Sequence, residues 1–110
     1  MKTIHNFYFY VQQDGSIKID CYCDGTEGTT EPSIFLTDPN EVGLCSLLVT
    51  ELSPNDIPQF GEVIFNQDGT IYMITFNGST GLMTNFLGEI LSANIVQNGA
   101  TLKTLIESKL

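Results

Sequence analysis

Two Gln-Asp-Gly tripeptides, at residues 13–15 and 67–69, constrain the fold of this chain more than any other feature. Each stands between segments in which apolar residues alternate, and Asp-Gly in that setting is typical of a β-hairpin turn. We therefore expect hairpins over residues 3–23 and 60–76. The tripeptides lie 54 residues apart and are followed by Ser-Ile and Thr-Ile. An internal repeat would explain this likeness, but the likeness is short, so we favour two independent uses of a common turn.

The register of the first hairpin can be chosen by the faces that it creates. A two-residue loop would pair Val11 with Lys18 and so place a charge on the apolar stripe. A three-residue loop with Gly15 in the left-handed conformation sorts apolar from polar side chains. This register pairs Val11 with Ile17, Phe9 with Ile19, Phe7 with Cys21 and His5 with Cys23. We prefer it because a slip by one residue would turn the core side chains outward.

The segments between and after the hairpins carry helix signals. A short strand is expected at 33–36, followed by a helix that Asp38 caps, with Pro39 at its first position and Glu41 completing a capping box. Ser53-Pro54 ends that helix. Apolar residues at helical spacing predict a second helix over 80–96 and a short third one over 101–110. Asn98-Gly99 is also a hairpin signal, so a strand is the rival interpretation of this region.

These elements predict a single α+β domain over residues 1–110, because 110 residues bury one core and not two. The expected architecture is a small antiparallel sheet from two hairpins with two or three helices, in the order ββ(β)αββα. The alternative is a mostly β protein. The second hairpin is apolar on both faces, so it should be central in the sheet or covered by a partner.

The charge distribution is one-sided because cations are missing. The chain has 13 Asp and Glu, four Lys and no Arg, and its net charge is −9. Between Lys18 and Lys103 it has no Lys, Arg or His at all. Binding to a phosphate backbone needs basic side chains that displace counterions. The sequence therefore argues against direct nucleic-acid binding and favours a protein partner. A partner with a basic surface is one such protein.

Three cysteines and one histidine raise the question of a metal site. His5, Cys21, Cys23 and Cys45 could form a zinc site, but Cys-x-Cys fits zinc spacing poorly and buried thiols explain the same pattern. Residues 20–31 match a calcium loop at Asp20, Asp24 and Glu31, yet Tyr22 replaces an oxygen ligand there. We therefore expect no metal or cofactor, and reduced thiols.

The chain begins without the apolar run of a signal peptide, and no segment approaches the roughly 20 apolar residues that span a bilayer. A location in the cytoplasm or in a virion is expected, without membrane association. No phosphate-binding, nucleophile-elbow or zinc-protease motif is present. With no Arg to neutralise a phosphorylated substrate, an enzyme is not expected.

Two functions are compatible with these features. The first is a non-enzymatic structural or accessory subunit of a macromolecular assembly, viral assemblies included, which acts through protein–protein contacts and can form a homo-oligomer. Its support is the high content of neutral polar residues and the doubly apolar hairpin. The alternative is an acidic inhibitor, immunity or counter-defence protein that blocks a basic site on its partner. The candidate binding residues are two outward tyrosines and three loop carboxylates: Tyr8, Tyr10, Asp24, Glu27 and Glu31.

Overall fold

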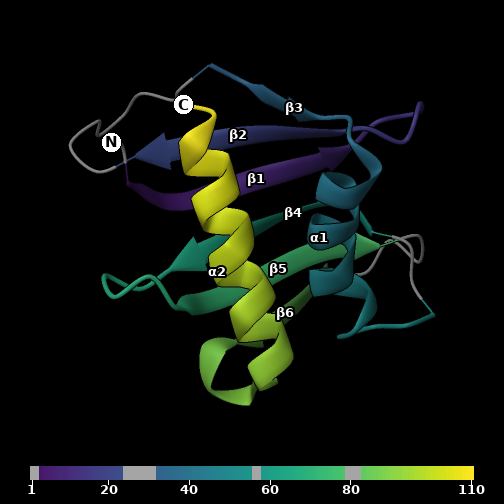
Figure 1. The fold of residues 1–110 in the computed structure, drawn as a ribbon. Coiled ribbons are helices and arrows are strands. Elements are labelled where there is room, and N and C mark those ends of the chain that lie inside the picture. The colour runs from purple at the N-terminus through teal and green to yellow at the C-terminus, as the bar shows by residue number, and fades with distance from the viewer. Residues whose placement is uncertain (1–2, 24–31, 56–57, 79–82) are drawn as a thin grey trace.

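The fold is a six-stranded antiparallel sheet with two helices on one of its faces. The computed structural model describes residues 3–23, 32–55, 58–78 and 83–110. The sheet order is β3-β2-β1-β4-β5-β6 (Figure 1). The elements in chain order are β1 (Ile4–Val11), β2 (Ile17–Cys23), β3 (Ile34–Leu36), α1 (Pro39–Thr50), β4 (Pro58–Phe65), β5 (Ile71–Gly78), β6 (Met83–Leu87), the 3₁₀ helix η1 (Gly88–Ile90) and α2 (Ala93–Ser108). The predicted α+β class is confirmed.

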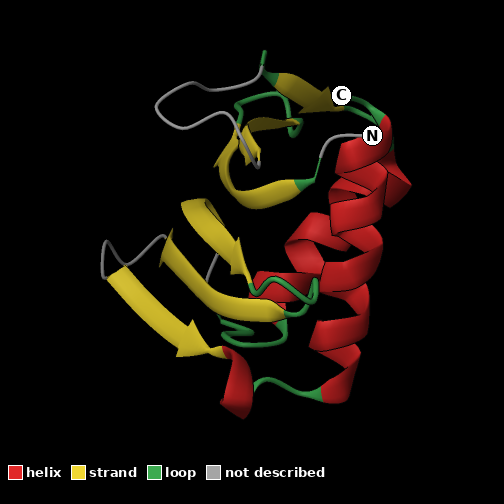
Figure 2. Ribbon diagram, turned by 90° about the vertical axis from the view of Figure 1, so that its left-hand side faces the viewer, coloured by secondary structure: helices red, strands yellow, loops and turns green. Residues whose placement is uncertain are grey.

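The core lies between the sheet and the two helices. Figure 2 shows both helices on the same side of the sheet, and α1 and α2 also contact one another. Alternate strand residues point toward them, as the period of two requires. The buried apolar side chains are Ile4, Phe7, Phe9, Ile17, Ile19, Cys21, Cys23, Leu36, Val63, Phe65, Ile71, Ile74 and Phe76 from the strands, with Cys45, Leu48, Val49, Ile95, Leu102 and Ile106 from the helices.

Both hairpins have the same three-residue turn. Val11 lies opposite Ile17 in the first and Phe65 lies opposite Ile71 in the second. Gly15 and Gly69 have φ angles of 88° and 89°. The three-residue loop with a left-handed glycine, predicted for the first hairpin, is therefore confirmed.

The aspartate of each turn holds the backbone that follows it. Asp14 Oδ1 accepts the N–H of Ser16 at 2.9 Å, and Asp68 Oδ1 accepts the N–H of Thr70 at 3.0 Å. The hydroxyl groups of Ser16 and Thr70 donate to the same oxygens. These hydrogen bonds to the charged form lower the pKa of both carboxyl groups.

Replacing Gly15 by valine should lower the free energy of unfolding by about 1–2 kcal/mol, because a β-branched residue is strained at positive φ. An added Cβ would meet no atom within 4 Å, so the loss would come from the backbone alone. Urea denaturation measures it. Gly69→Val should cost the same amount, and an unchanged stability in both variants would contradict the turn conformation.

The chain consists of two βββα units with the same order of elements. Strands β1 and β4 begin 54 residues apart, and so do helices α1 and α2. β1 and β4 are antiparallel neighbours at the middle of the sheet, where Tyr8 lies opposite Glu62. A pseudo-twofold axis therefore passes between these two equivalent residues. The two Asp-Gly turns belong to an internal structural repeat, so the favoured interpretation as two independent turns is wrong.

One predicted residue pair, at the start of β1, is wrong. A bulge between Ile4 and Asn6 places Ile4, and not His5, opposite Cys23. The bulge buries the isoleucine and leaves the imidazole exposed. Burying Ile4 in place of His5 lowers the free energy of the fold, because an apolar side chain gains from burial and a titratable one loses its hydration.

The predicted helix over 80–96 is wrong in its first half. Met83–Leu87 is strand β6, which pairs with β5, and residues 79–82 lie outside the described part of the chain. Helix α2 begins only at Ala93, after Ser92, whose hydroxyl accepts the N–H of Ile95 at 3.2 Å. The third predicted helix is the second half of α2. Asn98-Gly99 lies inside that helix and is not a hairpin turn.

Helix α1 begins as predicted at Pro39, and Asp38 Oδ1 accepts the N–H of Asn40 at 2.8 Å. The Glu41 carboxylate lies 3.4 Å from Lys109 Nζ near the end of α2. Glu41 therefore joins the two helices. Among the described residues, neither helix is long and apolar enough to cross a membrane.

Candidate functional site

The side of the sheet away from the helices is covered by no described element (Figure 2). We call the side chains that point to this side the open face. The strand registers place them opposite one another across all six strands. They are Asn6, Tyr8, Tyr10, Lys18, Asp20, Tyr22, Phe35, Phe60, Glu62, Ile64, Met73, Thr75, Asn77, Met83, Asn85 and Leu87.

Large apolar side chains on the open face are in contact with solvent. Phe35 and Met83 are each 53% exposed, and Phe60 and Leu87 are each 40% exposed. Antiparallel sheets that face water usually carry polar side chains on the wet side. Apolar patches of this kind are typical of interaction surfaces.

A carboxylate stands at the centre of the open face. Asn6 Nδ2 donates to Glu62 Oε2 at 2.7 Å. Burial raises the pKa of Tyr8, and the negative charge of Glu62 and a hydrogen bond to it raise that pKa further. Tyr8 therefore remains protonated near neutral pH and can donate to the carboxylate. Asn6 and Tyr8 together fix the direction of the Glu62 side chain.

The tyrosines of β1 and β2 make two separate contacts. The rings of Tyr8 and Tyr22 meet edge to face with centroids 5.8 Å apart. Lys18 Nζ lies 5.4 Å from the centroid of the Tyr10 ring and 3.7 Å from an oxygen of Asp20. These contacts hold the aromatic side chains of the first repeat in fixed positions.

A cavity of about 280 Å³ opens in the middle of the open face. Its walls come from four strands, β1 of the first repeat and β4, β5 and β6 of the second. The lining residues are Tyr8, Tyr10, Phe60, Gly61, Glu62, Thr75 and Met83. Aromatic, thioether and carboxylate groups thus converge on one recess, which suits a small part of a larger partner.

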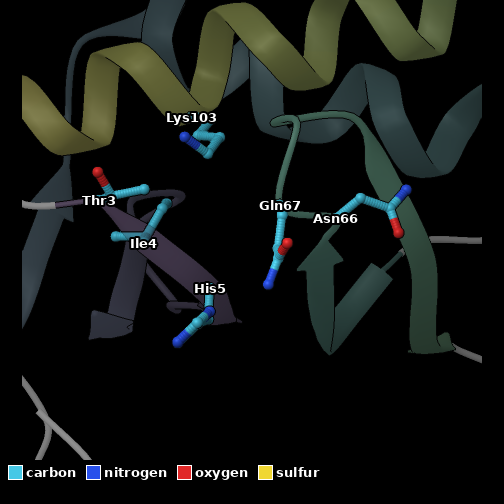
Figure 3. Close-up of a pocket in the computed structure, with 6 residues that line it drawn as sticks. All are labelled: Thr3, Ile4, His5, Asn66, Gln67 and Lys103. Atoms are coloured by element: carbon cyan, nitrogen blue, oxygen red, sulfur yellow. The ribbon is translucent and has the colours of Figure 1, made fainter. Parts of the chain in front are cut away.

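A second cavity, of about 370 Å³, lies at the end of the sheet between β1, the β4–β5 turn and α2 (Figure 3). Lys103 lines it, but its ammonium group is held 2.9 Å from Glu107 Oε2. Figure 3 shows the His5 ring pointing away from Lys103. The two titratable side chains are therefore not arranged as an acid–base pair.

The described lysines are all paired with carboxylates. Each lies within 4.0 Å of a carboxylate: Lys18 with Asp20, Lys103 with Glu107, and Lys109 with Glu41. Glu62 has no basic neighbour at ion-pair distance among these lysines. Among the described residues, Asn6 and Tyr8 hydrogen-bond to this central carboxylate.

The structure brings together only part of the predicted site. Tyr8 and Tyr10 lie on the open face, away from both helices, and both line the central cavity. Asp24, Glu27 and Glu31 lie outside the described residues. Sequence reasoning missed Glu62 and Met83, which belong to the second repeat. The alternation of Phe60, Glu62 and Ile64 was the available signal for this part of the face.

No metal site is formed by the residues that the structure describes, since no three potential ligands gather there. His5 is exposed, whereas the three cysteines are buried. Comparison with known proteins adds no family, because no family profile, curated protein or solved structure matches this chain. Inferences about function therefore rest on the geometry described above.

We expect the cysteines to be structural thiols. Burial raises the pKa of the Cys45 thiol to about 12. At pH 8 its thiolate fraction would then be roughly 0.01%, against about a quarter for an ordinary cysteine. A thiol reagent at pH 8 should leave Cys45 unlabelled in the native protein and titrate three thiols after denaturation. Fewer than three thiols, or one equivalent of zinc in the purified protein, would contradict this expectation.

Proposed function

We propose that this chain is a non-enzymatic protein-binding subunit whose open face docks on another protein. The observation that carries the proposal is the open face, which no described element covers (Figure 2) and which exposes Phe35, Phe60, Met83 and Leu87. Such a face is normally packed against another layer. Tyrosine, phenylalanine and methionine are enriched in protein interfaces, and charged residues are depleted at their centres. The open face has Tyr8, Tyr10, Phe60 and Met83 around its centre, with a single carboxylate, Glu62, among them.

The size of the open face supports a macromolecular partner. Six strands about 4.8 Å apart, each contributing about five residues at roughly 3.4 Å per residue, span on the order of 400 Å² as a flat area. Side-chain relief makes the accessible area larger, and a standard interface buries about 800 Å² on each partner. A small ligand would cover only the central cavity and leave Phe35 and Leu87 in water.

The setting that we propose is a macromolecular assembly in the cytoplasm or in a virion, in which the chain serves as a structural or accessory subunit. A protein partner is favoured over nucleic acid, because the described lysines are all paired with carboxylates and cannot displace counterions. A second copy of the chain is an admissible partner.

One observation favours a second candidate function. The described surface has lysines only in ion pairs, and the chain carries a net charge of −9. Such a field steers association with a basic surface. An acidic inhibitor, immunity or counter-defence protein that blocks a basic site would use the same open face. Its binding would weaken steeply with added salt.

The proposal is tested with two pairs of substitutions matched in size. Phe60→Ser with Met83→Ser removes apolar side chains from the open face. Leu47→Ser with Ile90→Ser removes exposed ones elsewhere, since Leu47 is 46% and Ile90 is 65% exposed. Oligomeric state is measured by light scattering, and partner capture by affinity purification, at low and high salt.

The open-face pair should lose self-association or its captured partner, while the control pair keeps it and both remain folded by circular dichroism. Binding that survives high salt favours the assembly subunit. Binding only at low salt favours the inhibitor. Equal behaviour of the two pairs at both salt concentrations would refute the open face as the docking surface.

A further inference from the structure

The central cavity of the open face has the chemistry of a cation-binding recess. Tyr8, Tyr10 and Phe60 present aromatic groups to it, and Met83 adds a polarisable thioether. The Glu62 carboxylate lines the same space of about 280 Å³. Aromatic faces attract cations through their quadrupole, and the attraction grows as water is excluded. A carboxylate beside them adds a directed acceptor for N–H donors.

The Glu62 carboxylate keeps accepting capacity for such a donor. An ionised carboxylate offers about four lone-pair sites. Asn6 uses one of them, at 2.7 Å from Oε2, and Tyr8 also hydrogen-bonds to the carboxylate. The lysines of the described chain are engaged elsewhere. A charged group that a partner would cover needs an opposite charge, since its desolvation is otherwise unfavourable.

The face already contains a smaller example of the same interaction. Lys18 Nζ lies 5.4 Å from the centroid of the Tyr10 ring and is neutralised by Asp20 at 3.7 Å. Tyr8 and Phe60 beside Glu62 repeat this combination of ring and carboxylate, and none of the ion pairs of the described lysines involves Glu62. An anionic group would be repelled there, and a neutral apolar one would bury the carboxylate without compensation.

Building on the proposed function, we infer that this cavity receives a cationic side chain, lysine or arginine, from the protein that docks on the open face. The occupant would place its ammonium or guanidinium group against Glu62 and its aliphatic stem along Met83 and Phe60. Tyr8 and Asn6 are positioning residues, because they hold the carboxylate.

The test is a nuclear magnetic resonance titration of the intact chain with three capped amino acids at low ionic strength: N-acetyl-lysine methylamide, N-acetyl-arginine methylamide and the neutral N-acetyl-norleucine methylamide. The Met83 methyl group and the rings of Tyr8 and Tyr10 report binding. We expect saturable shifts with at least one cationic probe, at an affinity at least fivefold higher than for norleucine. Comparison of the lysine and arginine probes identifies the preferred cation.

Glu62→Gln should lower the affinity for the preferred cationic probe at least fivefold. The matched control is Glu89→Gln, which removes the same charge from an exposed residue of η1 and should change nothing. Tyr10→Leu should also lower the affinity for the cationic probe more than the affinity for the norleucine probe. Equal binding of all three probes, no saturable shift, or an unaffected Glu62→Gln variant would overturn the inference.

The outcome is separable from that of the proposed function. If the open-face serine variant loses its partner but the cavity binds no cation, only the present inference fails. If the cavity binds the cation while the serine variant keeps its partner, the docking surface fails and the cation site stands.

Discussion

Replacing Gly61 by alanine is expected to lower the free energy of unfolding by about 3 kcal/mol, near the upper end for overpacking a core. Gly61 lies in β4 opposite Phe9 of β1 and faces the core. A Cβ at this position would overlap the Thr75 carbonyl oxygen and come within 2.7 Å of Phe9 Cζ. The carbonyl belongs to the neighbouring strand and cannot move without breaking the β4–β5 pairing. Urea denaturation monitored by circular dichroism measures the loss.

The matched control is Gly43→Ala. Gly43 lies inside α1, and an added Cβ there would meet no atom within 4 Å. Alanine in a helix interior is favoured over glycine, so this variant should gain about 0.5–1 kcal/mol. If Gly61→Ala were as stable as the natural chain, the close approach of β1, β4 and β5 would be wrong.

Replacing Glu107 by glutamine is expected to lower the free energy of unfolding by about 3 kcal/mol, because it leaves Lys103 as an uncompensated charge in a largely buried place. The two side chains are 10% and 15% exposed, and their N–O distance is 2.9 Å. Glu107 Oε2 also accepts the N–H of Ile4 at 2.9 Å. Glutamine can keep that hydrogen bond, so the experiment isolates the ion pair.

Two further variants serve as controls for this prediction. Glu41→Gln breaks the more exposed pair with Lys109 and should cost no more than about 1 kcal/mol. Joining Lys103→Met to Glu107→Gln should recover most of the lost stability, because it removes both charges and keeps an acceptor for the Ile4 N–H. If Glu107→Gln lowered the free energy of unfolding no more than Glu41→Gln does, the Lys103–Glu107 pair would be solvated.

The features predicted from the sequence are those set by neighbouring residues. Asp14-Gly15 determined the turn, and the turn determined the register, since only one loop length keeps Phe7 and Phe9 on a common face. Likewise Asp38 and Pro39 indicated where α1 begins. Each of these signals acts within a few positions of the chain.

Strand β6 could not be predicted in this way. Phe86 stacks on Phe76 in the core layer while Met83 and Leu87 lie on the open face, so the segment is apolar on both sides and shows no alternation. Short apolar segments of this kind fit helix and strand equally well. The choice is made by the free edge of β5, which is a tertiary feature.

The candidate site was likewise predictable only where local signals determine it. Tyr8 and Tyr10 could be assigned to the outer face of one hairpin from alternation alone. Their meeting with Glu62 and Met83 requires the pairing of β1 with β4, across more than fifty residues of sequence, and no local pattern specifies which strands become neighbours. The position of the loop carboxylates Asp24, Glu27 and Glu31 stays a prediction.

The pseudo-twofold axis between Tyr8 and Glu62 has a consequence for recognition. A surface with true twofold symmetry would offer any asymmetric partner two equivalent poses, related by half a turn. Here the repeats have diverged at their shared centre, with a phenol on one side and a carboxylate on the other, where two glutamates would repel. Lys18 lies opposite Tyr10 in the first repeat, whereas Met73 lies opposite Ile64 at the equivalent place in the second. The side chains of the two repeats thus remove this rotational ambiguity, so that a protein docked on the open face as proposed would be held in a single orientation.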